Sequence, residues 1–160
     1  MKRTIVSASV LALAFAGAQV ATAAPAQYKV TGGGQIIVDT EEMPASGPGQ
    51  TIAFTAQSAP TAADESAARG QFQYNSHTGV KFHGTVLCLV VEGNRATLAG
   101  EQRDGTPFQV DVVDNGQGAE AMDDLILLTE PDDVDCSQPE DPTMELGRGN
   151  VKVHKVKTAE

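Results

Sequence analysis

The chain has 160 residues, no tryptophan, two cysteines and a formal net charge of −10. This excess of carboxylates excludes nucleic acid as a partner and disfavours an anionic membrane surface, because phosphate contacts require Lys and Arg. Solubility outside the cell is the simplest role for the charge, and binding of a cation or a basic partner is the alternative.

Residues 1–26 have the pattern of a signal peptide. Lys2 and Arg3 form a charged start, an apolar run follows over residues 5–20, and two A-x-A cleavage sequences occupy residues 21–26. The apolar run is too short and too rich in alanine for a membrane span. We therefore expect residues 27–160 to form a single secreted domain without a membrane anchor, with a net charge of −12 once Lys2 and Arg3 are removed.

Short alternating segments predict β-strands along the whole domain. Residues 28–31 open the domain, and the triple glycine at residues 32–34 is expected to break this segment as a bend or bulge; no Lys-Ser/Thr follows it, so a phosphate-binding loop is excluded. Residues 58–69 are expected to form a connection with one helical turn at 62–68. The predicted strands cover residues 35–38, 51–57, 70–75, 80–91, 95–101, 108–113, 124–129 and 150–156.

The stretch over residues 80–100 predicts the hairpin around which the domain is organised. The turn falls at Glu92-Gly93-Asn94-Arg95, where Gly93-Asn94 tolerates positive φ. The second strand is expected to be buried on one side only. Strict alternation places one set of residues of the first strand on a single face, namely Phe82, Gly84, Val86, Cys88 and Val90.

About eight short strands without a long amphipathic helix predict an all-β, antiparallel fold. Most connections are short, as in an up-and-down meander, and closing the meander into a barrel removes its exposed edges. A two-sheet β-sandwich is the alternative. The most continuously apolar strand, residues 124–129, is expected to be central.

Cys88 and Cys136 are the only cysteines, and both lie in the domain expected to be exported. In an oxidising compartment such a pair is expected to form a structural disulfide; a free thiol or a two-ligand metal site is the alternative. This bond would add about 4 kcal/mol to the free energy of unfolding in the chain-entropy model. It would also attach an acidic loop, residues 130–148, to the hairpin.

An oxygen-rich cluster around a glycine turn is a weak calcium candidate. The spacing departs from an EF-hand, because Met122 stands where the bidentate Glu should be, and an Asx-stabilised hairpin turn explains the same residues. We therefore expect no metal or other cofactor. The candidate calcium ligands are Asp111, Asp114, Asn115, Asp123 and Asp124.

No motif for catalysis is present. The histidines, His77, His83 and His154, lack H-x-H or HExxH spacing, and no GxSxG elbow accompanies Ser76-His77. Few aromatic residues are available to line a sugar cleft. An enzyme is thus disfavoured, and a hydrolase is the least favoured function.

Three segments resemble a group of small exported all-β proteins of high-GC Gram-positive bacteria. They are Gly84-Thr85-Val86 with Cys88-Leu89 and Gly93-Asn94; Phe108-x-Val110-x-Val112-x-Asp114-Asn115-Gly116; and Gly149-Asn150-Val151-x-Val153-His154. Leu87 departs from the pattern, where a polar residue is common. These are turn and strand residues, so the resemblance implies a fold and assigns no chemistry.

The sequence therefore favours a secreted, non-catalytic binding or cell-envelope module. Its variable loops, residues 58–69 and 130–148, are expected to present a surface at one end of the barrel. The alternative is a barrel that holds a small apolar ligand. Such a ligand requires a hollow interior, whereas an interior filled by aromatic and leucine side chains would exclude it.

Overall fold

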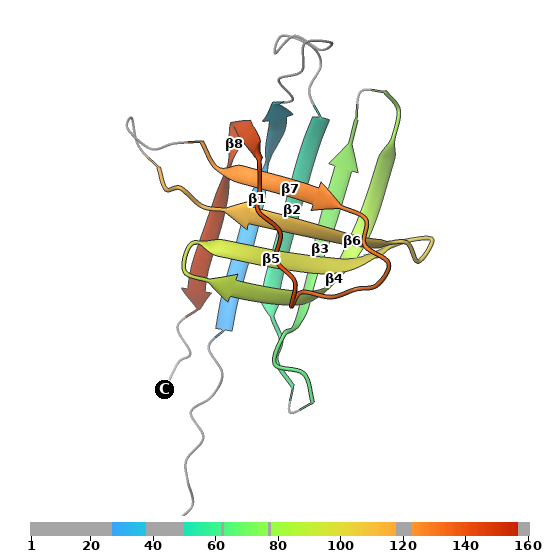
Figure 1. The fold of residues 1–160 in the computed structure, drawn as a ribbon, viewed down its shortest axis with the longest axis vertical. Coiled ribbons are helices and arrows are strands. Elements are labelled where there is room, and N and C mark those ends of the chain that lie inside the picture. The colour runs from blue at the N-terminus through green and yellow to red at the C-terminus, as the bar shows by residue number, and fades with distance from the viewer. Residues whose placement is uncertain (1–26, 38–49, 62, 77, 118–122, 157–160) are drawn as a thin grey trace, which may run out of the picture.

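The computed structural model describes residues 27–37, 50–61, 63–76, 78–117 and 123–156, and these form a closed, all-antiparallel β-barrel (Figure 1). The order of strands in the barrel is their order in the chain, and β8 pairs with β1. This confirms the predicted meander barrel over the sandwich. The strands are β1 Gln27–Ile37, β2 Gln50–Ser58, β3 Ala67–Asn75, β4 Lys81–Glu92, β5 Arg95–Gln102, β6 Pro107–Val113, β7 Leu125–Thr129 and β8 Met144–Val156.

The barrel is flattened into two layers whose strands cross at a steep angle (Figure 1). The strands β5, β6 and β7 run across the front, and β1, β2, β3 and β8 lie behind them. The strand β4 passes from the rear layer to the front layer, and its pairing with β5 shifts register between Val86 and Cys88. A β-bulge at this point bends the strand and carries it around the corner of the barrel. The search for a helix that could cross a membrane, made over the described residues, found none.

The interior is packed with aromatic and aliphatic side chains from nearly every strand. Phe72 stacks on Phe108 with ring centroids 5.1 Å apart, and Phe82 packs 5.4 Å from Phe72. Two glycines make room for the rings, because a Cβ at Gly32 would collide with Phe54 and one at Gly84 with Phe108. Aromatic rings thus fill the space that an apolar ligand would need, which argues against a ligand-holding barrel. The members of this core from β7 are Ile126 and Leu128.

The bulge in β4 overturns part of the predicted alternation. Phe82 and Val86 face the interior as expected, but one extra residue between Val86 and Cys88 reverses the faces that follow. Cys88 therefore points outward and is buried there, while Leu89 enters the core. The hairpin turn itself is confirmed, with Gly93 at φ 65° and Glu92 paired with Arg95.

Several predicted boundaries were wrong for tertiary reasons. The triple glycine leaves β1 continuous, because Gly34 and Gly149 let β1 and β8 approach closely; the bulge lies one residue later, between Gln35 and Ile36. Ala67 begins β3, so the segment expected to be helical is partly strand. The last strand begins at Met144 instead of residue 150. The strand β7 is the shortest of the eight, and only two of its residues pair with β8.

A Gly84→Ala substitution tests the packing of ring on glycine. The added methyl collides with Phe108, whose ring is fully buried and also packs on Phe72, so we expect a loss of about 1–3 kcal/mol in the free energy of unfolding. Chemical denaturation measures it. Thr85→Ala, on the exposed side of the same strand, is the control and should cost less than about 1 kcal/mol. Equal losses would contradict the close fit.

Candidate functional site

A long loop, residues 130–143, covers the outer face of β4, β5 and β6 (Figure 1). It carries six carboxylates and no Lys or Arg. The predicted disulfide is confirmed: Cys136 bonds to Cys88, with 6.1 Å between their Cα atoms, and both are buried with Ala99 in a small cluster outside the barrel. We call this segment the acidic loop. It lies against the side of the barrel, not at one end as expected from the sequence.

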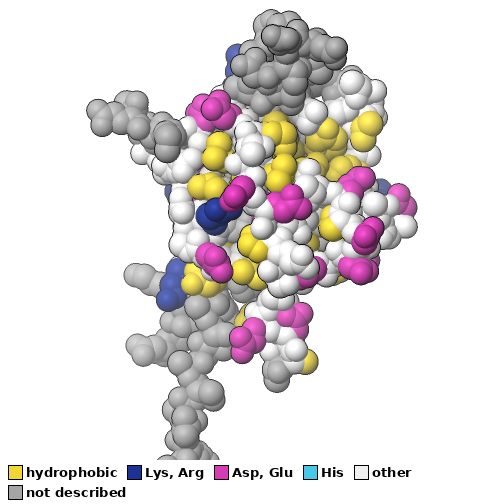
Figure 2. All heavy atoms as spheres, viewed as in Figure 1, with side chains coloured by type: hydrophobic (Ala, Val, Ile, Leu, Met, Phe, Trp, Pro, Cys, Tyr) yellow, Lys and Arg dark blue, Asp and Glu magenta, His cyan; other side chains and the backbone are white. Residues whose placement is uncertain are grey.

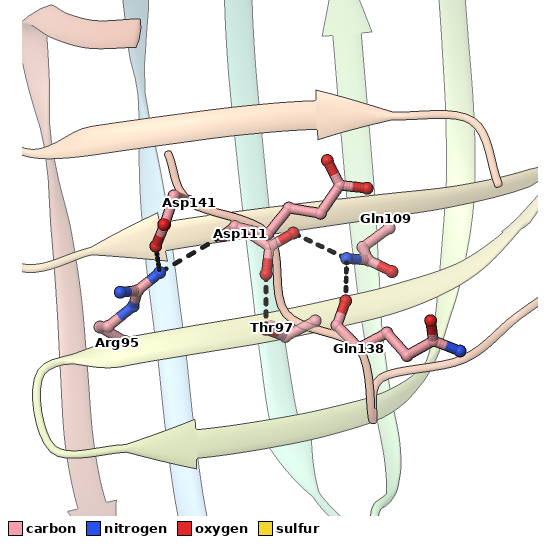
Figure 3. Close-up of polar contacts among 7 residues, drawn as sticks. Arg95, Thr97, Gln109, Asp111, Gln138 and Asp141 are labelled. Carbon is pink, nitrogen blue, oxygen red and sulfur yellow. Dashed lines mark hydrogen bonds and ion pairs between the residues drawn. The ribbon is translucent and has the colours of Figure 1, made fainter. Parts of the chain in front are cut away.

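A buried polar network lies under the acidic loop (Figure 3). Asp111 is only 2% exposed, and its Oδ1 accepts a hydrogen bond from the Thr97 hydroxyl at 2.6 Å. Its Oδ2 accepts from the Gln109 side-chain amide at 2.8 Å, and that amide also donates to the Gln138 carbonyl of the loop at 3.0 Å. The register explains the arrangement, because Thr97 pairs with Asp111 and Gln109 precedes Asp111 by two residues on the same face.

Arg95 binds the C-terminal end of the acidic loop (Figure 3). Its Nη2 donates to Oδ1 of Asp141 at 2.7 Å and to the carbonyl of Glu140 at 3.3 Å. Both charged side chains are substantially exposed, so this ion pair contributes at most about 1 kcal/mol. The disulfide and the buried network therefore hold the loop, and Arg95 sets where its end lies.

A pocket of about 210 Å³ opens between the acidic loop and the barrel. Asp111 and Thr97 contribute to its lining, and Glu92 and Asp141 bring further carboxylates, whereas Arg95 is the one basic residue among the described residues of the lining. The lining also includes Val90, Cys136 and Pro139 outside the barrel, together with Ala96 and Val112, which belong to the barrel core. Figure 2 shows acidic side chains distributed over this face of the barrel with few basic ones between them. The pocket therefore combines an excess of negative charge with an apolar lining.

The calcium candidates do not act together. Asp111 belongs to the buried network, whereas the carboxylate of Asp124 accepts the backbone amides of Asn115 and Val151. Asp114 accepts the amide of Val153 at 2.9 Å. These two carboxylates join the turn after β6 to β8, beyond the two residue pairs of the β7–β8 ladder. Among the described residues, no group of three or more His, Cys, Asp or Glu is arranged to hold a metal ion.

The other two members of the candidate cluster, Asp123 and Asn115, also serve the turn. The side-chain amide of Asn115 donates to the carbonyl of Asp123 at 2.8 Å. The side chain of Asp123 is exposed. Hydrogen bonds to main-chain groups thus account for this part of the cluster, in line with the turn interpretation.

The residues considered for nucleophilic catalysis are dispersed. His83 and His154 are exposed on β4 and β8, which are not neighbours in the barrel, and neither hydrogen-bonds to a carboxylate within the described ranges. The Ser76 hydroxyl is 2.7 Å from that of Thr78 and accepts the amide of Val80. His77 lies outside the described residues. The geometry thus lends no support to a hydrolase.

Sequence reasoning missed most of the pocket. Thr97, Gln109 and Arg95 stand at outward strand positions, where polar residues usually meet solvent. The cysteine pair was the one signal that a loop would return to this face. It could not identify the side chains that the loop would cover.

Replacing Asp124 with Asn tests the role of its carboxylate in joining the turn after β6 to β8. Asn has one acceptor oxygen where two amides are now bonded, so we expect a loss of about 1–3 kcal/mol in stability and faster hydrogen exchange at the Val151 amide. Denaturation and exchange measured by NMR report both effects. Asp123→Asn, an exposed neighbour with the same change of charge, should be near neutral. Equal effects at both positions would show that charge alone matters.

The acidic loop has a titratable marker in Asp135. Hydrogen bonds from the backbone amide and then the hydroxyl of Ser137 lower the pKa of Asp135 below its ordinary value of 3.8. Because the folded pKa is depressed, the ionised form stabilises this turn at neutral pH, and the stabilisation is lost as the pH falls through the folded pKa.

A carboxyl titration by NMR of Ser137→Ala checks this cause. We expect the pKa of Asp135 to rise part of the way to its ordinary value, since the amide of residue 137 remains. Asp104, whose pKa is lowered mainly by the backbone amide of Thr106, serves as the internal control and should not move. An unchanged pKa at Asp135 would refute the role given to the hydroxyl.

Searches with the chain found no matching family model, no matching curated protein and no matching solved structure. Function is therefore inferred from three features, which are the pocket under the acidic loop, its excess of carboxylates and the disulfide that holds the loop in place.

Proposed function

We propose that the protein is a secreted, non-catalytic binding module that engages a positively charged partner through the face covered by the acidic loop. The signal-peptide pattern of residues 1–26 and the disulfide support export to an oxidising compartment. The net charge of −10 suits a cationic partner, because complementary potentials steer association and exclude partners of like charge.

The observation that carries this proposal is the attachment of the acidic loop to the barrel. Six carboxylates on a free loop would be solvated and mobile. Here Cys136 is bonded to β4, Gln138 to Gln109, and Asp141 to Arg95. A surface held in place loses less conformational entropy when it binds, and this favours recognition over simple solvation.

An enzymatic function has less support. In the part of the chain that the structure describes, the closest approach of a hydroxyl to a buried carboxylate is Thr97 to Asp111, at 2.6 Å. Thr97 is itself only 4% exposed, and the second oxygen of Asp111 accepts from Gln109, an amide that orients the carboxylate but cannot act as an acid or base. This arrangement supports a binding surface better than a nucleophile.

The test measures binding of protein secreted by cells that express the full chain to immobilised oligolysine and oligoglutamate peptides. We expect binding to oligolysine only, with affinity that falls as salt is raised. The triple variant Asp132→Asn, Asp133→Asn, Glu140→Gln should weaken binding by about tenfold, since each lost rim charge removes long-range attraction. All three side chains are exposed on the acidic loop.

The matched control is Glu65→Gln, Glu101→Gln, Glu145→Gln, which removes the same charge from exposed positions outside the loop. It should bind oligolysine almost as the wild type does. If both triple variants weaken binding equally, net charge is responsible and the proposal for this face fails. It fails as well if the wild type does not distinguish the two peptides.

A further inference from the structure

We infer that the pocket under the acidic loop binds a primary alkylammonium group, with Asp111 as its innermost carboxylate. This inference rests on the proposed function, because it names the chemistry that the acidic face recognises. The shared chemistry is a protonated amine on an alkyl stem, supplied either by a free amine or by a lysine side chain.

Asp111 is a buried carboxylate whose partners among the described residues are neutral. A buried carboxylate is normally paired with a cation, since removal of a charge from water is costly. Asp111 is 2% exposed, yet within the described part of the chain its hydrogen-bond partners are the neutral Thr97 hydroxyl and Gln109 amide. These two groups orient the carboxylate without cancelling its charge. Each of its oxygens accepts one hydrogen bond and retains a further acceptor site.

Among the described residues that line the pocket, Arg95 is the one basic side chain. Arg95 lines the same pocket, but its Nη2 is engaged by the Asp141 carboxylate and the Glu140 carbonyl. In Figure 3 the side chains of Arg95 and Gln109 lie on opposite sides of Asp111. Arg95 points toward Asp141 at the end of the acidic loop. With Asp141 matched to Arg95, the carboxylates of Glu92 and Asp111 remain for a ligand.

The shape and lining of the pocket suit an alkyl stem that ends in a charged group. Its volume of about 210 Å³ suits a small group, and Val90 and Pro139 supply apolar surface beside the carboxylates. An alkyl stem can bury its methylenes against such a lining while its charged head meets the oxygens. An ammonium is a compact charge with three donors, whereas a guanidinium is a wider planar fork, so the pocket should prefer the ammonium.

The experiment titrates n-butylammonium chloride into isotopically labelled protein, secreted from the full chain, and follows its amide NMR spectrum at constant ionic strength. We expect saturable shifts at the Gln109 side-chain amide and at the backbone amides of Ala96 and Thr97. Sodium chloride should not reproduce them, and butylguanidinium should bind more weakly. Absence of saturable shifts, or identical shifts with sodium chloride, would overturn the inference.

Two variants locate the site. Asp111→Asn keeps the side-chain shape and should weaken n-butylammonium binding by about tenfold or more, as loss of a buried charge partner does. Glu92→Gln, at an exposed lining position, should weaken it several-fold even if Asp111→Asn disturbs the fold. Glu101→Gln, an exposed acid that does not line the pocket, is the control and should bind as the wild type does. Affinity unchanged in Glu92→Gln would overturn the inference.

A further comparison identifies the source of the amine and separates this inference from the proposed function. A blocked lysine peptide that binds at least about tenfold more tightly than n-butylammonium points to a protein partner, and equal affinity points to a free amine. Either result supports the site. Oligolysine binding that is lost in the acidic-loop triple variant but unchanged in Glu92→Gln would overturn the pocket while the proposed function stands.

Discussion

The bond between Cys88 and Cys136 is the constraint on which the outer face of the barrel depends. The bulge between Val86 and Cys88 turns the cysteine outward, where it can meet the returning loop. With uninterrupted alternation Cys88 would share the inner face with Val86 and could not reach Cys136. One inserted residue therefore decides that this barrel has a covered exterior. Thr97, Ala99 and Asp111 are buried as a result, at positions that would otherwise face water.

The interior of the barrel is filled by its own side chains, so a binding site is sought on the outer face. The barrel is filled by rings that lie over glycines, Phe54 against Gly32 and Phe108 against Gly84. An eight-stranded barrel is wide enough either to be filled by its own side chains or to hold one small ligand. Here Phe72 stacks on Phe108 and the tilted ring of Phe82 packs against both, so the inside serves stability. Concave space with chemical variety is found under the acidic loop instead.

Local patterns predicted much of the fold because they report local physics. Alternation over β2 marks a strand with one buried face, and Gly93 and Gly105 mark turns that need positive φ. The errors occurred where distant segments decide the outcome. The glycines of β1 stay in the strand because β8 and a phenylalanine approach them, and the site depends on a loop that arrives from the far end of the sequence. Pairing of the cysteines predicted a tether but could not show what it would cover.

The acidic residues of the chain illustrate how partners, more than residue type, determine a role. Asp114 and Asp124 accept hydrogen bonds from main-chain amides of β8. These bonds attach the two carboxylates to that strand. The six carboxylates of the acidic loop are close to water, where charge costs little. Asp111 is different, because it is buried, borders a pocket and is held by neutral donors that leave its charge unbalanced. A carboxylate that only had to stabilise the sheet could be replaced by a neutral side chain at lower cost, so the charge at this position is better explained by a cation that the pocket receives.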